Sequence, residues 1–567
     1  MLRYDGPLIV QADRQVLLDE RHPRANEARE SLCRFADLVK RPGDLHTYRI
    51  TPLSVWNAAA AGVTPEEIAD CLVGYSRYDV PASLLDDIGR LTGRYGKLRL
   101  ERRGDEIVLV TFDSSLAAEL GNLAGWAEER PSGTGVFEWT VPGERRGTLK
   151  QELIRRGYPV LDLAGYHQGE SLPVELRERA AGGRAFSLRD YQERAVDLFY
   201  REGDKHGGSG MLVLPCGAGK TVIGIAALSR LRCATLILTS NVTSVRQWKS
   251  ELLDKTTLTE EDVGEYAGHM RDIKPVTIAT YQIMTHRRSK DDGFVHMHLF
   301  GDRDWGLIIY DEVHLLPAPV FRMTADIQAT RRLGLTATLV REDGREEDVF
   351  SLIGPKRFDP SWRTLEAGGW IARVTCNEIR VPLEGAYADR YASAEPRAKH
   401  RIAAENPAKA DVVRELLRRH RGSSVLVIGQ YLNQLKKLAG AIGAPMITGA
   451  TPYDEREVLY DRFKTGDTPV IVVSKVANFA VDLPDAAVAI QVSGSFGSRQ
   501  EEAQRIGRIM RPKPGENAAW FYTLVSEGTK ETEFALKRQL FMTEQGYEYE
   551  LVGGSGVAGS MRMEAVE

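Results

Sequence analysis

The chain has 567 residues, 43% of them hydrophobic, which is enough for several packed cores and too many for a disordered protein. A net charge of −4 excludes a globally basic nucleic-acid binder, so nucleic acid would have to bind local clusters of Lys and Arg. Five scattered cysteines without metal-ligand spacing, no signal peptide and no membrane-length apolar run predict free thiols, no membrane partner and a cytoplasmic location.

Residues 1–115 are predicted to form a first α+β module. Thr64, followed by Pro65 and Glu67, is typical of a helix start with a capping box. The other expected elements are a strand at 7–11, helices at 25–38 and 81–95, and a hairpin at 97–101 and 106–112. Helices followed by a hairpin are typical of a winged helix, although many small α+β modules share this order. The hairpin arginines are either a DNA contact or a solvated turn.

Residues 116–180 are predicted to form a second small α+β domain, with a strand at 136–141 and a helix at 148–156. Strands and helices then alternate in two successive segments, 181–370 and 411–550, as in parallel α/β sheets. The expected strands are 211–214, 235–238, 276–280, 307–310 and 333–336 in the first segment, and 425–428, 469–473, 487–492 and 519–524 in the second. A linker or thumb-like segment is expected at 371–410 and a disordered tail at 551–567.

A glycine-rich loop follows the first of these strands and precedes a helix, which is the arrangement of a phosphate-binding P-loop. Its glycines let backbone N–H groups point inward, and the helix N-terminus adds positive potential. Lys220 supplies a full charge for phosphates, and the Thr221 hydroxyl is a Mg²⁺ ligand. The strict motif begins with Gly where Leu214 stands, and a turn that caps a helix is the structural alternative. The loop consists of Leu214, Pro215, Cys216, Gly217, Ala218, Gly219, Lys220 and Thr221.

Two further motifs complete an ATPase pattern. Asp311 and Glu312 follow a buried strand, where Asp311 is expected to hold Mg²⁺ and Glu312 to orient and deprotonate water. Gln504, Arg508 and Arg511 are spaced to share one helix face, and the two arginines are expected to act as arginine fingers. Two carboxylates that cap a strand, or an exposed charged helix, are the structural alternatives for either motif alone.

Two shorter motifs lie beside these. Gln192, upstream of the loop, has the donor and acceptor needed to bind an adenine edge. Thr336 and Thr338 end a strand, and their hydroxyls are expected either to relay nucleotide state or to form a simple turn.

In combination, these motifs resemble those of superfamily two helicases, and more closely the bacterial type of the XPB family of DNA helicases. The segments that carry the resemblance are 311–314, 335–343, 353–356, 474–476 and 498–508. The likeness extends from about residue 186 to 549 and, more weakly, before it. It implies an α/β fold with two tandem RecA-like domains behind smaller α+β N-terminal domains, the second of which is damage-recognition-like.

The resemblance further implies ATP-dependent unwinding of DNA with 3′-to-5′ polarity, with ATP and Mg²⁺ as cofactors. Arg189 and Asp482 are implied nucleotide contacts. The implied DNA contacts are Thr239, Ser240, Thr280, Tyr281, Arg341, Glu342, Asp343, Ser474 and Lys475. Residues 386–405, rich in Tyr, Lys and Arg, are either a DNA-binding thumb or a charged helical linker.

A free-standing bacterial repair enzyme is expected rather than a transcription-factor subunit. Long charged extensions are absent, and the tripeptide 477–479 departs from the eukaryotic form. DNA single strands and forks are the expected partners, a nuclease is a further one, and the protein is expected to be a monomer. The alternative to a DNA helicase is a duplex-DNA translocase or an RNA helicase built on the same motor. A third hypothesis is a binding protein with an inactive ATPase.

Overall fold

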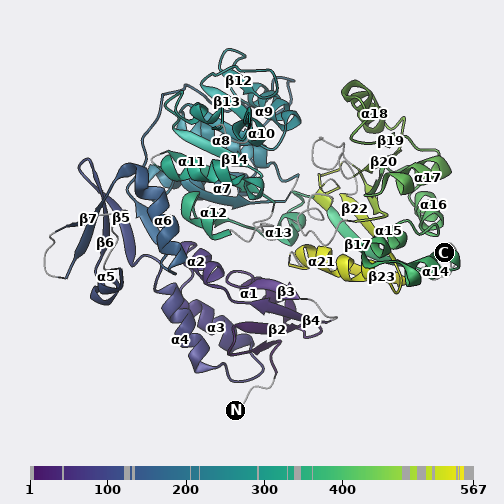
Figure 1. Ribbon diagram of the computed structural model, residues 1–567, viewed down its shortest axis with the longest axis horizontal. Helices are drawn as coiled ribbons and strands as arrows, with labels where there is room; N and C mark the ends of the chain where they lie inside the picture. The colour runs from purple at the N-terminus through teal and green to yellow at the C-terminus, as the bar shows by residue number, and fades with distance from the viewer. Residues whose placement is uncertain are drawn as a thin grey trace. The chain divides into compact units, whose positions relative to one another are not determined.

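A computed structural model of the chain describes residues 5–40, 44–120, 128–130, 135–204, 206–215, 217–289, 293–328, 330–337, 346–360, 362–474, 486–494, 506–507, 509–513, 517–544, 547 and 549–553. The chain divides into two compact units, one formed by Met1–Leu214 with Gly219–Asp359 and the other by Pro215–Ala218 with Pro360–Glu567. Each unit contains one large sheet, and the first also carries two small ones (Figure 1). Within these described ranges no helix is long and apolar enough to cross a membrane.

The first small sheet is antiparallel, with strand order β1-β2-β4-β3. Its strands are β1 (Leu8–Val10), β2 (Gln15–Asp19), β3 (Asp37–Lys40) and β4 (Leu45–Arg49), and its helices are α1 (Ala25–Leu32), α2 (Pro52–Ala60), α3 (Pro65–Tyr75) and α4 (Ala82–Thr92). The capping box at Thr64 is confirmed, because its side chain accepts from the Glu67 N–H while the Glu67 carboxylate accepts from the Thr64 N–H. The helix predicted to reach residue 38 is wrong at its end, since β3 pairs with β4 there.

The predicted hairpin forms, but it belongs to the next domain. β5 (Leu98–Arg103) and β6 (Glu106–Thr111) pair antiparallel, and then join β8 (Phe137–Val141) and β9 (Val160–Leu163) in a five-stranded sheet. The remaining elements of this domain are α5 (Ser114–Leu120), β7 (Glu128–Arg130) and α6 (Arg146–Arg155). A boundary at residue 115 would therefore cut this sheet, and the winged-helix prediction is wrong because the hairpin's ladder bonds go to β8 and β9.

The large sheet of the first unit is parallel, with strand order β12-β13-β11-β14-β15-β10-β16. The five predicted strands are confirmed as β10 (Ser209–Val213), β11 (Thr235–Thr239), β13 (Val276–Thr280), β14 (Leu307–Asp311) and β15 (Arg331–Thr336). The edge strands β12 (Val263–Tyr266) and β16 (Lys356–Phe358) were not predicted from the sequence. The helices are α7 (Asp190–Tyr200), α8 (Lys220–Leu231), α9 (Val242–Lys255), α10 (Tyr281–Met284), α11 (Ala318–Asp326) and α12 (Glu346–Leu352). Burial on both faces explains the apolar runs of the central strands.

The second unit holds a second parallel sheet, with strand order β19-β20-β18-β21-β22-β17-β23. Its strands are β17 (Arg373–Val381), β18 (Val425–Gly429), β19 (Met446–Ile447), β20 (Val470–Ser474), β21 (Val488–Gln491), β22 (Ala518–Ser526) and β23 (Tyr549–Gly553). The prediction of a linker at 371–410 is wrong for β17, which pairs with β22 and β23 inside the sheet. Residues 551–553 likewise belong to β23 rather than to the predicted tail.

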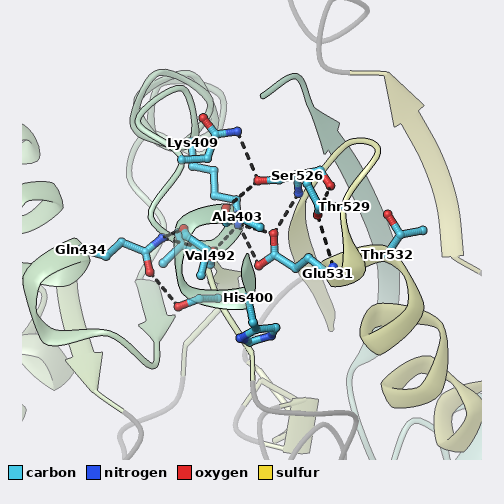
Figure 2. A network of polar contacts seen from close by, with 12 residues as sticks. His400, Ala403, Lys409, Gln434, Val492, Ser526, Thr529, Glu531 and Thr532 are labelled. Carbon is cyan, nitrogen blue, oxygen red and sulfur yellow. Dashed lines mark hydrogen bonds and ion pairs between the residues drawn. The ribbon is translucent and has the colours of Figure 1, made fainter. Parts of the chain in front are cut away.

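The helices of the second unit are α13 (Trp362–Ala367), α14 (Ala386–Ser393), α15 (Pro396–Ala404), α16 (Lys409–Arg419), α17 (Leu432–Ile442), α18 (Tyr453–Thr465) and α21 (Lys530–Glu544). A buried ion pair joins two of them to the sheet (Figure 2). Lys409 Nζ donates to both carboxylate oxygens of Glu531, at 2.9 and 2.8 Å, and to the Val492 carbonyl at 2.9 Å. Glu531 also accepts from the Ser526 N–H at 2.9 Å. Because both charges are buried, removal of either partner alone would leave an uncompensated charge inside the unit.

His420 at the end of α16 makes the stability of this unit depend on pH. Burial, with a smaller contribution from Arg419, lowers its pKa to about 4 from an ordinary value near 6.5. Between these values the unfolded chain binds more protons than the folded one, so stability falls as the pH falls from 6.5 towards 4. We expect His420→Gln to lessen the stability lost between pH 7 and pH 5 by about 1 kcal/mol, with some of the charge screened by solvent.

Urea unfolding at the two pH values measures this difference. The matched control is His269→Gln, which changes an exposed histidine and should preserve the wild-type pH dependence. An equal pH dependence in wild type and His420→Gln would contradict the prediction.

Candidate functional site

The predicted ATP-site motifs of the first unit meet at one edge of its parallel sheet. The strand register sets Val213 beside Thr336, and Asp311 beside Leu335. The phosphate loop that follows β10, the acidic pair that ends β14 and the threonine that ends β15 are therefore neighbours. The carboxyl edge of an open α/β sheet is where ligands bind, so this arrangement is that of a nucleotide site.

The phosphate loop has the backbone geometry that a phosphate cradle needs. Gly217 and Gly219 have φ values of 86° and 78°, a region that glycine adopts without strain. A Cβ on Gly219 would lie 2.6 Å from Gln192 Nε2, so a larger residue here would displace that amide. α8 begins directly at Lys220, so its free N–H groups point towards the loop. Leu214 is buried and its N–H donates to the Thr336 carbonyl at 2.9 Å. This N–H therefore extends the pairing of β10 with β15 and does not point to a bound phosphate.

Lys220, the first residue of α8, and Glu312, which follows β14, form an ion pair at the centre of the site. Lys220 Nζ lies 3.3 Å from Glu312 Oε1. Glu312 has a φ of 52°, which is uncommon for a side chain of its size and is the kind of strain found at functional sites. The predicted base therefore lies within reach of the predicted phosphate-binding lysine.

His314 connects the acidic motif to the next strand. Its Nδ1 lies 2.7 Å from Thr336 Oγ1, and the same nitrogen lies 3.4 Å from Glu312 Oε2. This contact gives a physical path for the predicted relay through Thr336. The sequence motif contained His314, but sequence reasoning assigned it no role.

Asp311 is half-buried, and its environment disfavours its charge. Burial, followed by the neighbouring Glu312 carboxylate, raises its pKa to about 6, while Trp248 and Lys220 act in the opposite direction. Trp248 Nε1 donates to Asp311 Oδ2 at 2.9 Å, and the Tyr281 hydroxyl donates to the Asp311 carbonyl at 2.9 Å. Trp248 was missed by sequence reasoning, because nothing in the α9 sequence indicates a contact 63 residues away.

Gln192 lies beside the phosphate loop, as the Gly219 contact shows. It is buried, and its Oε1 accepts from the Arg189 N–H at 3.0 Å. This bond fixes the side-chain amide at the start of α7. The structure thus brings Gln192 and Arg189 to the same site as Lys220.

The predicted DNA contacts of the first unit lie on neighbouring strands, with Thr239 and Thr280 in register. Most of their side chains are buried or form hydrogen bonds within the domain. Thr280 Oγ1 accepts from the Ile283 N–H at 3.2 Å, and Tyr281 is buried. Ser240 is half-buried and accepts from Asn241 Nδ2 at 2.9 Å. Backbone groups at these strand ends are therefore better placed to contact phosphates than the threonine hydroxyls are.

In the second unit, Ser474 is buried at the end of β20, and Arg511 is half-buried. The predicted thumb at 386–405 forms α14 and α15. No side chain of α14 is buried, and the Tyr391 hydroxyl accepts from the Lys530 N–H at 2.8 Å. The predicted residues that lie outside the described ranges are Cys216, Thr338, Arg341, Glu342, Asp343, Lys475, Asp482, Gln504 and Arg508.

Three family models match this chain. The ERCC3/RAD25/XPB C-terminal helicase model matches residues 365–564. The type III restriction enzyme res subunit model matches residues 185–341, which span the phosphate loop and the acidic motif. A helicase conserved C-terminal domain model matches residues 8–128.

Full-length relatives agree with these matches. The DNA 3′-5′ helicase XPB of Kineococcus radiotolerans is 51% identical over 98% of both chains. The protein of the same name from Mycobacterium tuberculosis is 51% identical over 96% of this chain and 97% of its own. Among solved structures, a fragment of a putative HsdR subunit of a type I restriction enzyme from Vibrio vulnificus aligns with a TM-score of 0.48 and 17% identity, over 65% of this chain and 69% of its own.

The bond from Trp248 to Asp311 predicts a measurable contribution to turnover. Trp248→Phe keeps most of the packing but removes the indole N–H that orients the carboxylate. Because Asp311 is the predicted Mg²⁺ ligand, we expect the Mg²⁺ concentration for half-maximal ATP hydrolysis to rise roughly tenfold, as when a hydrogen bond to a metal-ligating group is lost.

Trp305→Phe is the matched control, because that indole is equally buried and donates to the Leu299 carbonyl at 2.8 Å, in the core of the same domain. Equal changes in the two variants would show that lost packing, rather than the Asp311 contact, explains the effect.

Proposed function

The chain belongs to the XPB family of DNA helicases, and we propose that it hydrolyses ATP to separate DNA strands with 3′-to-5′ polarity. The observation that carries this proposal is the Lys220–Glu312 pair beside Asp311 at the carboxyl edge of the sheet. It joins a phosphate-binding cation to a candidate base in one site, which an inactive nucleotide-binding fold would not need.

The ion pair supplies a way to link substrate binding to catalysis. The β- and γ-phosphates of ATP compete with the Glu312 carboxylate for the Lys220 ammonium. A carboxylate released in this way orients a water against the γ-phosphorus and accepts its proton at an Oε atom. His314 contacts both Glu312 and Thr336, so the release of Glu312 from Lys220 would also alter the contacts of Thr336 at the end of β15.

Mg²⁺ fits this donor set. Among the described residues no three His, Cys, Asp or Glu side chains cluster as a protein-only metal cage, and Mg²⁺ is usually held by one or two carboxylates together with substrate phosphates. The half-buried Asp311 carboxylate and the Thr221 hydroxyl at the start of α8 are the side chains that would hold it. When bound, the ion neutralises phosphate charge.

Gln504, Arg508 and Arg511 are proposed to supply the remaining charge to the γ-phosphate, and Arg189 and Asp482 to contact the nucleotide. The support is the sequence motif that these residues form. The helix face predicted from the spacing does not extend to Arg511, because residues 509–511 are not helical in the structure. An arginine finger contributes about 10³–10⁵ in rate to related phosphoryl-transfer reactions. Closing and opening of the two RecA-like domains on ATP would then move a bound strand.

DNA is proposed to be held by strand-end groups near Thr239, Ser240, Thr280, Tyr281, Ser474 and Lys475, with Arg341, Glu342 and Asp343 at the strand junction. Contacts of this kind grip phosphates without reading bases. The family supports a role in DNA repair. A monomer in the cytoplasm, with a nuclease as partner, is proposed from the resemblance of the sequence alone.

The site assignment predicts that Lys220→Ala abolishes DNA-stimulated ATP hydrolysis, by about 10²-fold or more, because the phosphates lose their fixed cation. Phosphate release measures the rate. Lys249→Ala is the matched control, since this lysine pairs with Glu260 and Glu265 elsewhere in the same unit. DNA-stimulated hydrolysis that survives in Lys220→Ala would refute the assignment.

Strand separation on tailed duplexes tests the function itself. We expect ATP-dependent unwinding of DNA with a 3′ single-stranded tail, and little with a 5′ tail, because the motor advances along one strand in one direction. Glu312→Gln should bind the same substrates without unwinding them. Unwinding of tailed RNA with equal efficiency would favour an RNA helicase, and ATP turnover on blunt duplexes without strand separation would favour a duplex translocase.

A further inference from the structure

A cavity of about 230 Å³ lies where three parts of the first unit meet. The N-terminal module contributes Tyr95, which follows α4. The five-stranded domain contributes Asp162 of β9 and Tyr166 after it. The motor domain contributes Arg201 at the end of α7 and Arg357 of β16. None of these residues belongs to the ATP site described above.

The walls of this cavity are joined by polar contacts between the three parts. The Lys356 N–H donates to Asn57 Oδ1 at 3.0 Å, which connects β16 to α2. Lys150 Nζ donates to Gln328 Oε1 at 2.6 Å, and Gln151 Nε2 donates to Asp348 Oδ1 at 2.9 Å, which connect α6 to the motor domain. The cavity is therefore a formed feature of the unit.

Its lining carries more positive than negative charge. Lys150, Arg201 and Arg357 line it, and Asp162 is its lining carboxylate. Asp162 is already neutralised, because Lys150 Nζ and Arg146 Nε bind its Oδ2 at 2.9 and 3.0 Å, and Arg146 Nη2 binds its Oδ1 at 2.7 Å. The guanidinium groups of Arg201 and Arg357 thus line the cavity without being paired with its carboxylate, Asp162.

Burial is the first cause of the pKa shifts of two of these cationic groups. The pKa of Lys150 is lowered to about 8, first by burial, with Asp162 acting in the opposite direction and Arg332 and Arg146 adding to the decrease. Burial also lowers the pKa of Arg357, with Tyr95 and Tyr166 acting in the opposite direction and Arg201 adding to the decrease. An anion in the cavity would relieve both effects.

Aromatic side chains form part of the cavity wall. Tyr95 and Phe350 both line it and contact each other edge to face, with ring centroids 6.4 Å apart. The Tyr166 ring contacts the guanidinium groups of Arg146 and Arg332, whose Cζ atoms lie 5.6 and 5.5 Å from its centroid. These contacts fix the rings and leave a concave, partly apolar wall beside the cations.

We propose that this cavity is a second ligand site, separate from the ATP site, that binds a small phosphate monoester of the size of a mononucleotide. Arg201 and Arg357 hold the phosphate, and the wall formed by Tyr95 and Phe350 holds the organic part. Arg357 is pre-positioned for this role, since its Nε and Nη2 donate to the Ser209 and His206 carbonyls at 3.1 and 2.8 Å.

The segment 353–356 gains a role from this site. Gly354 lines the cavity with a φ of 132°, and a Cβ there would lie 2.8 Å from the Gly210 N atom, so glycine lets this segment approach β10. β10 runs directly into the phosphate loop, and β16 pairs with it. A ligand held by Arg357 therefore contacts the strand that positions the ATP site.

Calorimetric titration of Lys220→Ala protein with inorganic phosphate, AMP and adenosine tests the proposal. The Lys220→Ala background weakens phosphate binding at the phosphate loop, and the Arg201 variants below assign the remaining binding to the cavity. A negative result here leaves the proposed helicase function untouched. In separate titrations we expect AMP and inorganic phosphate each to bind with a stoichiometry of one per chain. AMP should bind more tightly than phosphate, and adenosine should bind poorly. Arg201→Asn should weaken phosphate binding roughly tenfold, and Arg201→Glu should weaken it further, because a charge-assisted contact is lost and then reversed.

Arg232→Asn is the matched control. Like Arg201, Arg232 is an exposed arginine that caps the end of a helix in the left-handed conformation, and it lies outside the cavity lining. Binding that is absent in the Lys220→Ala background, or that responds equally to changes at 201 and 232, would overturn the proposal. Loss of duplex-DNA binding in Arg201→Asn without loss of AMP binding would identify a nucleic-acid contact instead and would also overturn it.

Discussion

The parallel direction of the strands in each large sheet is the constraint on which the rest of the structure depends. Parallel strands bring all their carboxyl ends to one edge, so residues far apart in sequence become neighbours there. Lys220, Asp311 and Thr336 follow or end three adjacent strands, and their separation in sequence has no bearing on their separation in space. A sheet with mixed strand directions would scatter these groups over two edges.

At that edge, electrostatics rather than shape sets the chemistry. Asp311 and Glu312 are consecutive, half-buried carboxylates, and each disfavours the charge of the other. Lys220 offsets this repulsion, and Trp248 holds one carboxylate by a hydrogen bond. The left-handed conformation of Glu312 sends its side chain to the lysine rather than along the strand direction. A site arranged in this way is sensitive to any phosphate that competes for the lysine.

The N-terminal domains are joined to the ATP-binding domain by specific contacts. Polar contacts at Asn57, Lys150 and Gln151 bind them to the same unit as the ATP-binding sheet. These contacts surround a cationic cavity. Its lining includes Arg357 of β16, the strand that pairs with β10. Control of the ATP site from the N-terminal side thus has a direct structural route, through β16 and β10 to the phosphate loop.

The sequence by itself determined the fold class, the nine principal strands of the two sheets and the ATP-site motifs, because buried parallel strands are continuous apolar runs and phosphate chemistry demands particular residues at fixed spacing. It did not determine that β17 lies inside the second sheet or that the hairpin of β5 and β6 belongs to the second small domain. β17 carries polar residues such as Asn377 and Glu378, so its burial is decided by neighbouring strands. The bond from Trp248 to Asp311 and the cavity around Arg357 likewise needed the tertiary structure, because contacts between distant segments leave no local pattern in the chain.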